Sequence, residues 1–289
     1  MQLNEYLYKG NMPLDLLQYS TFAPHNLQKD NIALQTQNNS KELYAYFDKL
    51  YASKKQGIII VLQAMDGAGK FSLIKNFFSN FNAVNFHIHS FFAPSQEEQQ
   101  HDLFWRFHHA LPKRGEISLL NYAYYEDCIQ ALVKPAIEPA CSKNIGEIAQ
   151  NYFAQIKQYE QYLEQSGYSI IKLFLHVSKD KQTERYLDRM QKPNRFWKFS
   201  TQDMLRRELQ DDYIAAYAKT IGHTATETAP WYILPADHKW YTSYLASEIL
   251  LQLCKKMQLE YPSIREQDML QLPIYLDRLQ REVHHEIEL

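Results

Sequence analysis

Short apolar runs alternate with amphipathic stretches along most of the chain. Residues 57–65, GIIIVLQAM, are continuous, short and rich in β-branched side chains, which is typical of a strand buried on both faces of a parallel sheet. Four later segments have the same character and predict further strands at 85–94, 117–121, 168–178 and 231–236. Strands that alternate with helical segments indicate a parallel sheet covered by helices on both faces.

The segments between these strands carry apolar residues at helical spacing. Helices are predicted over 40–55, after Gly69, and over 95–111, 145–166, 179–191, 201–219 and 240–258. Residues 1–39 are polar and contain prolines, so we predict an N-terminal arm there. One domain is predicted over 40–262, followed by a charged helical tail over 263–289.

Composition narrows the class of protein. The chain has 31 basic and 33 acidic side chains, so its formal charge of −2 does not point to an anionic partner, and only local clusters can. The longest aliphatic run, 58–62, is too short to span a bilayer, and no signal peptide is recognisable, so we expect a cytoplasmic protein without membrane contact. Cys128, Cys141 and Cys254 are far apart and odd in number, which favours neither a disulfide framework nor a zinc site.

Residues 62–75, LQAMDGAGKFSLIK, come close to the phosphate-binding pattern G-x-x-x-x-G-K-[ST]. Gly69 and Lys70 stand in place between a strand and a helix, where backbone N–H groups and a mobile cation would face a phosphate. Ala64 replaces the first glycine, and Phe71 replaces the hydroxyl residue that holds Mg²⁺. Asp66 is the nearby carboxylate that can take over the magnesium. The alternative is an ordinary glycine-rich turn that carries a surface lysine.

Residues 185–207 concentrate basic side chains. They contain seven lysines and arginines against two aspartates, and Pro193 separates two helical segments. A basic helix, a break and a second basic helix indicate a mobile lid over anionic phosphates. The alternative is a solvated charged surface, although Phe196, Trp197 and Phe199 are interleaved with the cations. No nucleic-acid-binding module is recognisable, so a nucleic-acid partner is not expected.

Together these segments resemble the polyphosphate kinase 2 family, in the branch that uses polyphosphate to phosphorylate nucleotides. LYASKKQGIIIVLQAMDGAGK is similar to the first strand of the family and its G-x-D-x-x-G-K loop. FFAPSQEEQQHDLFWRFHHALPKRGEI is similar to its next strand–helix block, and NYAYYED stands at its Walker B-like segment. KLFLHVSKDKQTERYLDRMQKPNRFWKFS is similar to the strand that leads into its lid. The likeness covers roughly residues 40–262 in order and with similar spacing.

The resemblance implies a three-layer α/β/α P-loop kinase-like fold with a parallel five-stranded sheet and a helical lid at about 185–210. It also implies Mg²⁺-dependent phosphoryl transfer between inorganic polyphosphate and a nucleoside mono- or diphosphate, by a homo-oligomer. Matching positions assign catalysis to Asp66, Lys70, Arg185 and Arg189, and the metal to Asp66, Glu126 and Asp127. They assign substrate binding to Gly67, Ala68, Gly69, Arg106, Arg114, Arg195 and Lys198.

Several positions depart from the family pattern. Phe71 stands where aspartate or glycine is typical, and Phe92 where lysine is common. Tyr122-Ala123 replaces an arginine and a serine, and Leu132 lies near the place of another arginine. Loss of an arginine that stabilises the transition state can cost about 10³-fold in rate. At Tyr122 the ring is available for stacking on a nucleobase or for packing in the core.

These departures leave two other functions open. One is a catalytically impaired family member that binds phosphates as a regulatory or hetero-oligomeric partner. The other is a nucleotide kinase that uses ATP and cannot use polyphosphate. Retention of Asp66, Gly69, Lys70 and the basic lid favours the working polyphosphate:nucleotide phosphotransferase.

Overall fold

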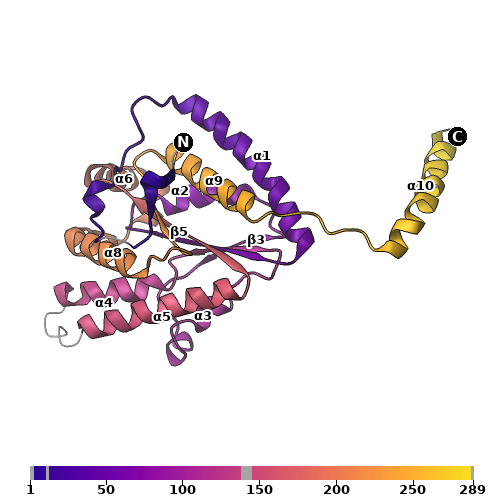
Figure 1. The fold of residues 1–289 in the computed structure, drawn as a ribbon. Coiled ribbons are helices and arrows are strands. Elements are labelled where there is room, and N and C mark those ends of the chain that lie inside the picture. The colour runs from indigo at the N-terminus through magenta and orange to yellow at the C-terminus, as the bar shows by residue number, and fades with distance from the viewer. Residues whose placement is uncertain (1–2, 11–12, 138–144, 288–289) are drawn as a thin grey trace. The chain divides into compact units, whose positions relative to one another are not determined.

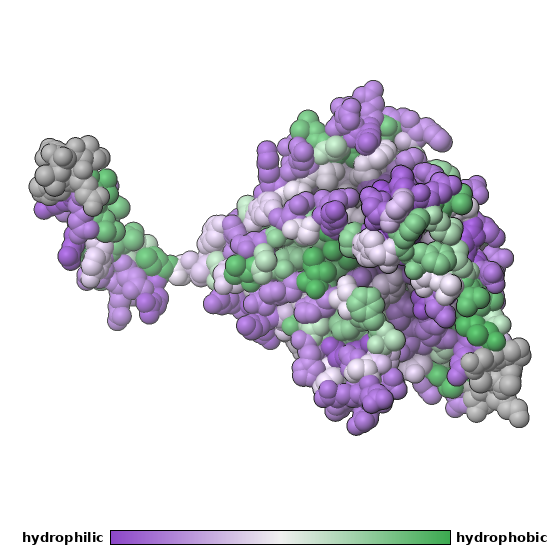
Figure 2. All heavy atoms as spheres, turned by 180° about the vertical axis from the view of Figure 1, so that it is seen from behind, coloured by the Kyte–Doolittle hydropathy of each residue, from purple (hydrophilic) through white to green (hydrophobic). Residues whose placement is uncertain are grey.

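The computed structural model describes residues 3–10, 13–137 and 145–287 and divides the chain into two units. The first unit, Met1–Leu259, contains a six-stranded sheet and the helices that cover it. The second, Glu260–Leu289, contains the helix α10 (Glu266–Ile287). The predicted C-terminal helix is therefore present, but it is less purely charged than expected, because large apolar side chains are exposed along it (Figure 2).

The five predicted strands are all present and parallel to one another. They are β2 (Gly57–Ala64), β3 (Phe86–Ser90), β4 (Ile117–Asn121), β5 (Tyr168–His176) and β6 (Trp231–Pro235). A sixth strand, β1 (Leu7–Tyr8), pairs antiparallel with β6, so the order is β1-β6-β5-β2-β4-β3 and the sheet is mixed. The prediction of five strands missed β1 because two residues give no readable periodicity.

Helices cover both faces of this sheet (Figure 1). One face carries α1 (Lys29–Ser53), α2 (Lys70–Asn76) and α9 (Lys239–Lys256). The other carries α3 (Trp105–His108), α4 (Tyr125–Ile137), α5 (Ile145–Gln165) and α8 (Gln210–Thr224). This arrangement confirms the predicted three-layer α/β/α fold. Short 3₁₀ helices at Leu3–Tyr6, Leu16–Gln18, Phe78–Asn80 and Glu98–Gln100 complete the connections.

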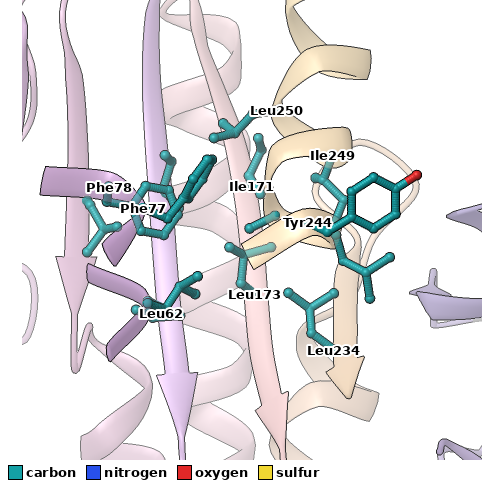
Figure 3. Packing of buried hydrophobic residues seen from close by; sticks show 14 of the residues in the cluster. Leu62, Phe77, Phe78, Ile171, Leu173, Leu234, Tyr244, Ile249 and Leu250 are labelled. Atoms are coloured by element: carbon teal, nitrogen blue, oxygen red, sulfur yellow. The ribbon is translucent and has the colours of Figure 1, made fainter. Parts of the chain in front are cut away.

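The central strand β2 contributes side chains to two separate hydrophobic cores. Its side chains alternate, so Ile58, Ile60 and Leu62 join the cluster beneath α1, α2 and α9, part of which Figure 3 shows. Ile59 and Val61 join the cluster beneath α4, α5 and α8. Each fully buried side chain of this kind contributes about 1.5–3 kcal/mol to folding. Burial on both faces explains why the strand sequence is continuously apolar rather than alternating.

Some helix boundaries differ from the prediction. The helix expected over 40–55 already begins at Lys29. Its first turns are polar and bury only Ile32, so their sequence shows no apolar periodicity that would predict a helix. The helix expected over 95–111 is broken, and the part that remains is α3, a single turn. The stretch expected as one helix over 201–219 divides at Leu209 into α7 (Thr201–Glu208) and α8.

Helix α4 was not predicted at all. It buries Tyr125, Ile129 and Val133 along one side, but it also contains Pro135, a residue that usually ends a helix. No described helix is long and apolar enough to cross a membrane. Cys128 and Cys254 are buried free thiols, and Cys141 lies outside the described residues.

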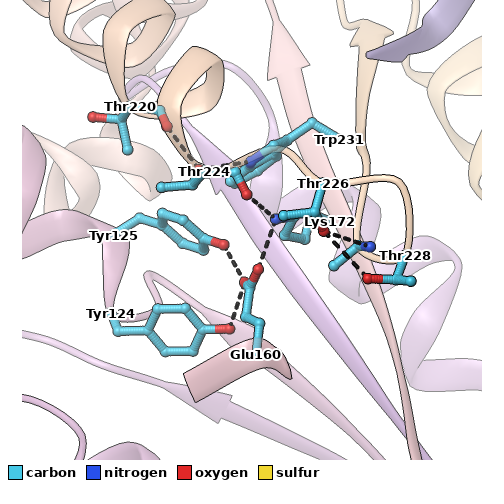
Figure 4. A network of polar contacts seen from close by, with 10 residues as sticks. Tyr124, Tyr125, Glu160, Lys172, Thr220, Thr224, Thr226, Thr228 and Trp231 are labelled. Atoms are coloured by element: carbon cyan, nitrogen blue, oxygen red, sulfur yellow. Dashed lines mark hydrogen bonds and ion pairs between the residues drawn. The ribbon is translucent and has the colours of Figure 1, made fainter. Parts of the chain in front are cut away.

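A buried ion pair lies on the α4–α5 side of the sheet (Figure 4). Lys172, in β5, donates to Glu160 Oε2 at 2.8 Å and to the carbonyl of Thr224 at 2.8 Å. The phenols of Tyr124 and Tyr125 both donate to Glu160 Oε1. Because every charge has a partner, the pair is tolerated away from water. It also anchors the chain directly after β4, where Tyr122 and Glu126 lie.

We expect Lys172→Met to destabilise the protein by about 3–5 kcal/mol, because it leaves the Glu160 carboxylate buried without a cation. The measurement is the free energy of unfolding in urea. The double variant Lys172→Met/Glu160→Gln should recover part of this loss, since no charge is then buried. A single variant as stable as the parent protein would contradict this account of the network.

Candidate active site

The order of the strands places a candidate site at the carboxyl end of β2. This strand lies between β4 and β5. After β2 the chain continues to β3, on the β4 side of the sheet, whereas β5 and β6 lie on the other side of β2. In open parallel sheets, ligands bind beyond the carboxyl ends of the strands at such a switch point. The loop 65–69, which carries the phosphate-binding pattern, occupies this position.

A groove of about 890 Å³ opens above this loop. The loop, the ends of β3 and β4, and the predicted lid form its walls. Three aspartates line it, namely Asp66, Asp188 and Asp203. They are outnumbered by seven basic side chains: Lys70, Lys75, Arg185, Arg189, Arg195, Lys198 and Lys239. The groove is therefore cationic although the whole chain is slightly acidic.

Two glycines allow the loop its shape. Gly67 has φ +80° and Gly69 has φ +108°, which are values that residues with side chains rarely adopt. A Cβ atom on Gly67 would lie 3.0 Å from Gln182 Cγ, and one on Gly69 would lie 3.4 Å from Arg185 Nη1. Both contacts come from α6 (Lys179–Gln191), so the glycines also let this helix pack against the loop.

Lys70 begins α2 and is nearly buried, with 6% of its surface exposed. Its ammonium donates to the carbonyl of Ala64 at 2.5 Å and lies 3.9 Å from the centre of the Tyr122 ring. Burial lowers the pKa of Lys70, and the nearby carboxylates of Asp66 and Glu126 oppose that effect. The lysine is thus held at the base of the groove by one carbonyl and one aromatic face.

Asp66 is held through both of its carboxylate oxygens. Tyr122 donates to Oδ1 at 2.8 Å, and Arg206 Nη1 donates to Oδ2 at 2.9 Å. Burial alone would raise the pKa of Asp66, but Lys70, Arg206 and the Tyr122 hydroxyl together lower it below the ordinary value. Asp66 is therefore a carboxylate at neutral pH and a poor proton donor or acceptor.

Arg185 lines the groove and also holds the loop in place. Its Nη1 donates to the carbonyls of Gly67 at 3.0 Å and Ala68 at 2.7 Å. Its Nη2 donates to the carbonyls of Ala236 at 2.6 Å and Asp237 at 3.3 Å, directly after β6. The side chain was predicted to act in catalysis. Its bonds connect the loop, α6 and the end of β6.

The predicted lid consists of α6, a 3₁₀ segment (Pro193–Lys198) and α7. Three of its cations are paired with aspartates of the same lid. Arg189 Nη1 lies 3.4 Å from Asp203 Oδ2, and Lys192 and Arg195 both form ion pairs with Asp188. Arg189 and Arg195 line the groove, as their predicted contact with phosphate requires.

Phe71 lies at the wall of the groove and does not close it. Its ring is 58% exposed, and the ammonium of Lys198 lies 4.3 Å from the ring centre. The same ammonium lies 4.8 Å from the ring of Trp197. Aromatic faces attract cations, so Phe71 holds a lid lysine above the loop.

Of the other positions that depart from the family pattern, one lines the groove and two lie in the core. Phe92 is 77% exposed and lines the groove. Ala123 is fully buried, and Leu132 packs against the core beneath the sheet. The last two are therefore core positions and add nothing to the groove.

The three predicted metal ligands do not gather. Asp66 and Glu126 line one small cavity of about 20 Å³, enough for a water molecule, beneath Arg206. Burial raises the pKa of Glu126 to about 7. Asp127 points elsewhere and lies 4.0 Å from Arg106. Within residues 3–10, 13–137 and 145–287, no three acidic, histidine or cysteine side chains are placed to hold a metal ion.

Two predicted substrate-binding arginines lie outside the groove. Arg106 donates to the carbonyl of Phe92 at 2.8 Å and packs against the Phe107 ring. Arg114 donates to the carbonyl of Ser166 at 2.9 Å. Arg114 precedes β4, so it lies at the amino ends of the parallel strands, opposite the groove. For both side chains the contacts support a structural role in place of the predicted phosphate binding.

Sequence reasoning missed the groups that surround Asp66. Arg206 was noted only as part of the basic segment, and Tyr122 as a replaced arginine with a ring for stacking or packing, so neither was expected to bond to Asp66. Gln182 donates to the backbone carbonyl of Asp66 at 2.6 Å, and Lys239 adds a cation to the groove from α9. For Gln182 the sequence did contain a signal. Its helical spacing from Arg185 and Arg189 places all three side chains along one side of α6.

Comparison with known proteins agrees with this site. The sequence model of the family described as Polyphosphate kinase 2 matches residues 26–262. An ADP-polyphosphate phosphotransferase of Rhodopseudomonas palustris is 36% identical in an alignment of 231 residues that covers 77% of this chain and 80% of the relative. An AMP/ADP-polyphosphate phosphotransferase of Meiothermus ruber is 36% identical over 213 residues, which are 74% of this chain and 77% of the relative.

A solved structure has the same fold. The crystal structure of Polyphosphate Kinase 2 from Arthrobacter aurescens TC1 superposes with a TM-score of 0.85 at 26% sequence identity. The match covers 95% of this chain and 97% of that chain. Similarity in sequence and in structure therefore extends across the sheet, the loop and the lid.

We expect Glu126→Gln to change how stability depends on pH. Because burial raises the pKa of Glu126 to about 7, the protonated form is favoured in the folded state, and that stability is lost as pH rises from about 4.5 through 7. The variant should therefore be more stable than the parent at pH 8.5, by on the order of 1–3 kcal/mol, and nearly equal at pH 5. Urea unfolding at both values measures this, with the exposed Glu97→Gln as control.

Arg206→Gln should raise the pKa of Asp66, because it removes the cation bonded to Oδ2. Carbon-13 NMR of the aspartate carboxyl groups measures the titration, with Asp66→Asn to assign the signal. Arg207→Gln is the matched control, since the neighbouring Arg207 bonds to Thr183 and not to Asp66. Equal Asp66 titrations in both variants would show that the ion pair has no influence.

Proposed function

The chain belongs to the polyphosphate kinase 2 family and is a phosphotransferase, and from this premise we propose that it transfers a phosphoryl group between inorganic polyphosphate and a nucleoside mono- or diphosphate with the help of Mg²⁺. The observation that carries this proposal is the buried Lys70 beside Asp66 at the base of a groove lined by seven basic side chains. A linear polyanion suits a cationic groove, because each phosphate unit adds a negative charge.

The reaction needs little covalent help from the protein. A terminal phosphate oxygen of the acceptor nucleotide attacks a phosphorus at the end of polyphosphate. One P–O bond forms, the bond to the next phosphate breaks, and the polymer leaves shortened by one unit. Because the attacking oxygen is already ionised, no general base is required, which agrees with the low pKa of Asp66. Positioning and neutralisation of charge provide most of the catalysis in such transfers.

Side chains of the groove supply both the positioning and the neutralisation of charge. Lys70 lies at the base of the groove, where its ammonium can follow the transferred phosphoryl. Arg189, Arg195 and Lys198 line the groove from the lid and neutralise the flanking phosphates. Arg185 contributes indirectly, by fixing the carbonyls of Gly67 and Ala68 and with them the course of the loop.

The carboxylates of the site fit a magnesium ion that is bound mainly by substrate. Mg²⁺ in phosphoryl-transfer sites is held by one or two carboxylates together with phosphates and waters. Asp66 is ionised and Glu126 lines the same cavity, whereas Asp127 is turned toward Arg106. When bound, the ion would neutralise charge on the transferring phosphates. Asp66 is the residue that would hold it, with Glu126 nearby.

The geometry favours a working enzyme over a protein that only binds phosphates. Phe71 leaves the groove open, and Arg206 brings a cation to the region where Tyr122 stands in place of arginine. Free buried thiols at Cys128 and Cys254 suit a reducing compartment, so we also propose a cytoplasmic protein. The exposed apolar side chains of α10 support the proposal that it works as a homo-oligomer.

We expect the purified protein, with Mg²⁺ and polyphosphate, to convert AMP, ADP, GMP or GDP to the next higher nucleotide. Lys70→Ala should lower this rate by about 10²–10³-fold, because it removes the cation at the base of the groove. Lys55→Ala is the matched control, since Lys55 is exposed and precedes β2 at the opposite edge of the sheet. Nucleotide products are measured by chromatography.

The donor distinguishes the alternatives. Transfer from ATP but not from polyphosphate would identify an ATP-using nucleotide kinase. Binding of polyphosphate without any transfer would identify a phosphate-binding partner. Either result would overturn the proposed function.

A further inference from the structure

Tyr122 has an unusual backbone conformation for its place in the fold. Its φ is +58°, in the left-handed region that bulky residues seldom occupy. The other two described non-glycine residues with positive φ are Lys54 and Gln258, which follow the ends of α1 and α9, where such values are common. Tyr122 instead follows directly after the strand β4. Strain at such a position persists only where the surrounding structure fixes it.

The left-handed turn decides where the ring points. Leu119 contributes to the core beneath α1 and α2, and Leu120 to the core beneath α4 and α5. If the strand continued, residue 122 would point to the same side as Leu120, away from α2. The turn redirects the ring to the loop, where it meets Asp66 and Lys70. The unusual backbone is therefore the condition for both contacts.

Each part of the side chain has a separate partner. The hydroxyl donates to Asp66 Oδ1 at 2.8 Å, which leaves Oδ2 to Arg206. The ring face lies 3.9 Å from the ammonium of Lys70. Because that face is occupied by a cation, a nucleobase stacked there, which was one expectation from the sequence, would have to displace Lys70. The contacts also involve more than packing, since Tyr122 lines the groove itself.

We propose that Tyr122 is a positioning residue for the transfer reaction, which orients the Asp66 carboxylate through its hydroxyl and the Lys70 ammonium through its ring. This inference rests on the proposed function and adds to it. It assigns to a neutral side chain the ordering of two charged groups, at a place where the resemblance predicted an arginine. The two tasks are chemically separable, and separate substitutions can remove them.

Three variants separate the tasks. Tyr122→Phe keeps the ring and removes the hydroxyl. Tyr122→Leu removes both the hydroxyl and the ring. Tyr122→Asn also removes both, but asparagine accepts positive φ more readily, so it relieves the backbone. Tyr162→Phe is the control for loss of a hydroxyl, because Tyr162 is exposed on α5, away from the groove.

We expect Tyr122→Phe to bind polyphosphate as the parent does and to lose on the order of tenfold in kcat, since one hydrogen bond to a charged group is lost. Tyr122→Leu and Tyr122→Asn should lose kcat further and also bind polyphosphate more weakly, because Lys70 is then held by the Ala64 carbonyl alone. Tyr122→Asn should keep or raise the melting temperature. Binding is measured by titration calorimetry with polyphosphate alone, and kcat and KM by the transfer assay.

The outcomes are distinguishable. If Tyr122→Phe retains the parent kcat and Tyr122→Asn retains the parent affinity, the positioning role is overturned. If every loss of activity follows a fall in melting temperature, the residue is structural only, and the proposal is also overturned. If the parent protein transfers no phosphate, the proposed function fails, and the binding measurements with Tyr122→Leu and Tyr122→Asn still test the contact with Lys70.

Discussion

The burial of opposite charges at the end of β2 is the constraint on which the rest of the site depends. Lys70 and Asp66 lie where the sheet, α2 and the lid meet, and neither is stable there alone, because removing a charge from water is costly. Contacts with neighbouring groups offset this cost. Tyr122 and Arg206 bond to Asp66, while the carbonyl of Ala64 and the Tyr122 ring hold Lys70.

The fold was largely readable from the sequence because β2 to β6 are short, continuous apolar runs separated by helical stretches. What was missed shares a physical cause. The two residues of β1 are too few to show a period, and the first turns of α1 bury little beyond Ile32. Pro135, a residue that usually ends a helix, lies within α4 and argues against a helix there. In each case tertiary packing, and not a local pattern, stabilises the element.

The site was readable only where its residues are close in sequence. Gly69, Lys70 and four of the lid cations follow local patterns, and the structure brings them to one groove. The bonds from Tyr122 and Arg206 to Asp66 join residues 56 and 140 positions apart, so no local pattern announces them. Arg114 is a different case, because its place before β4 already implies the edge of the sheet opposite the groove.

The ion pairs within the lid have a consequence for which anions the groove selects. Arg189 is engaged by Asp203, and Arg195 by Asp188, before any ligand arrives. An incoming anion must therefore compete with carboxylates that are already in place at a high effective concentration. A single phosphate gains little from one such exchange, whereas a polymer makes several exchanges for one loss of translational freedom. In the proposed reaction these internal pairs would therefore favour a multivalent anion over orthophosphate.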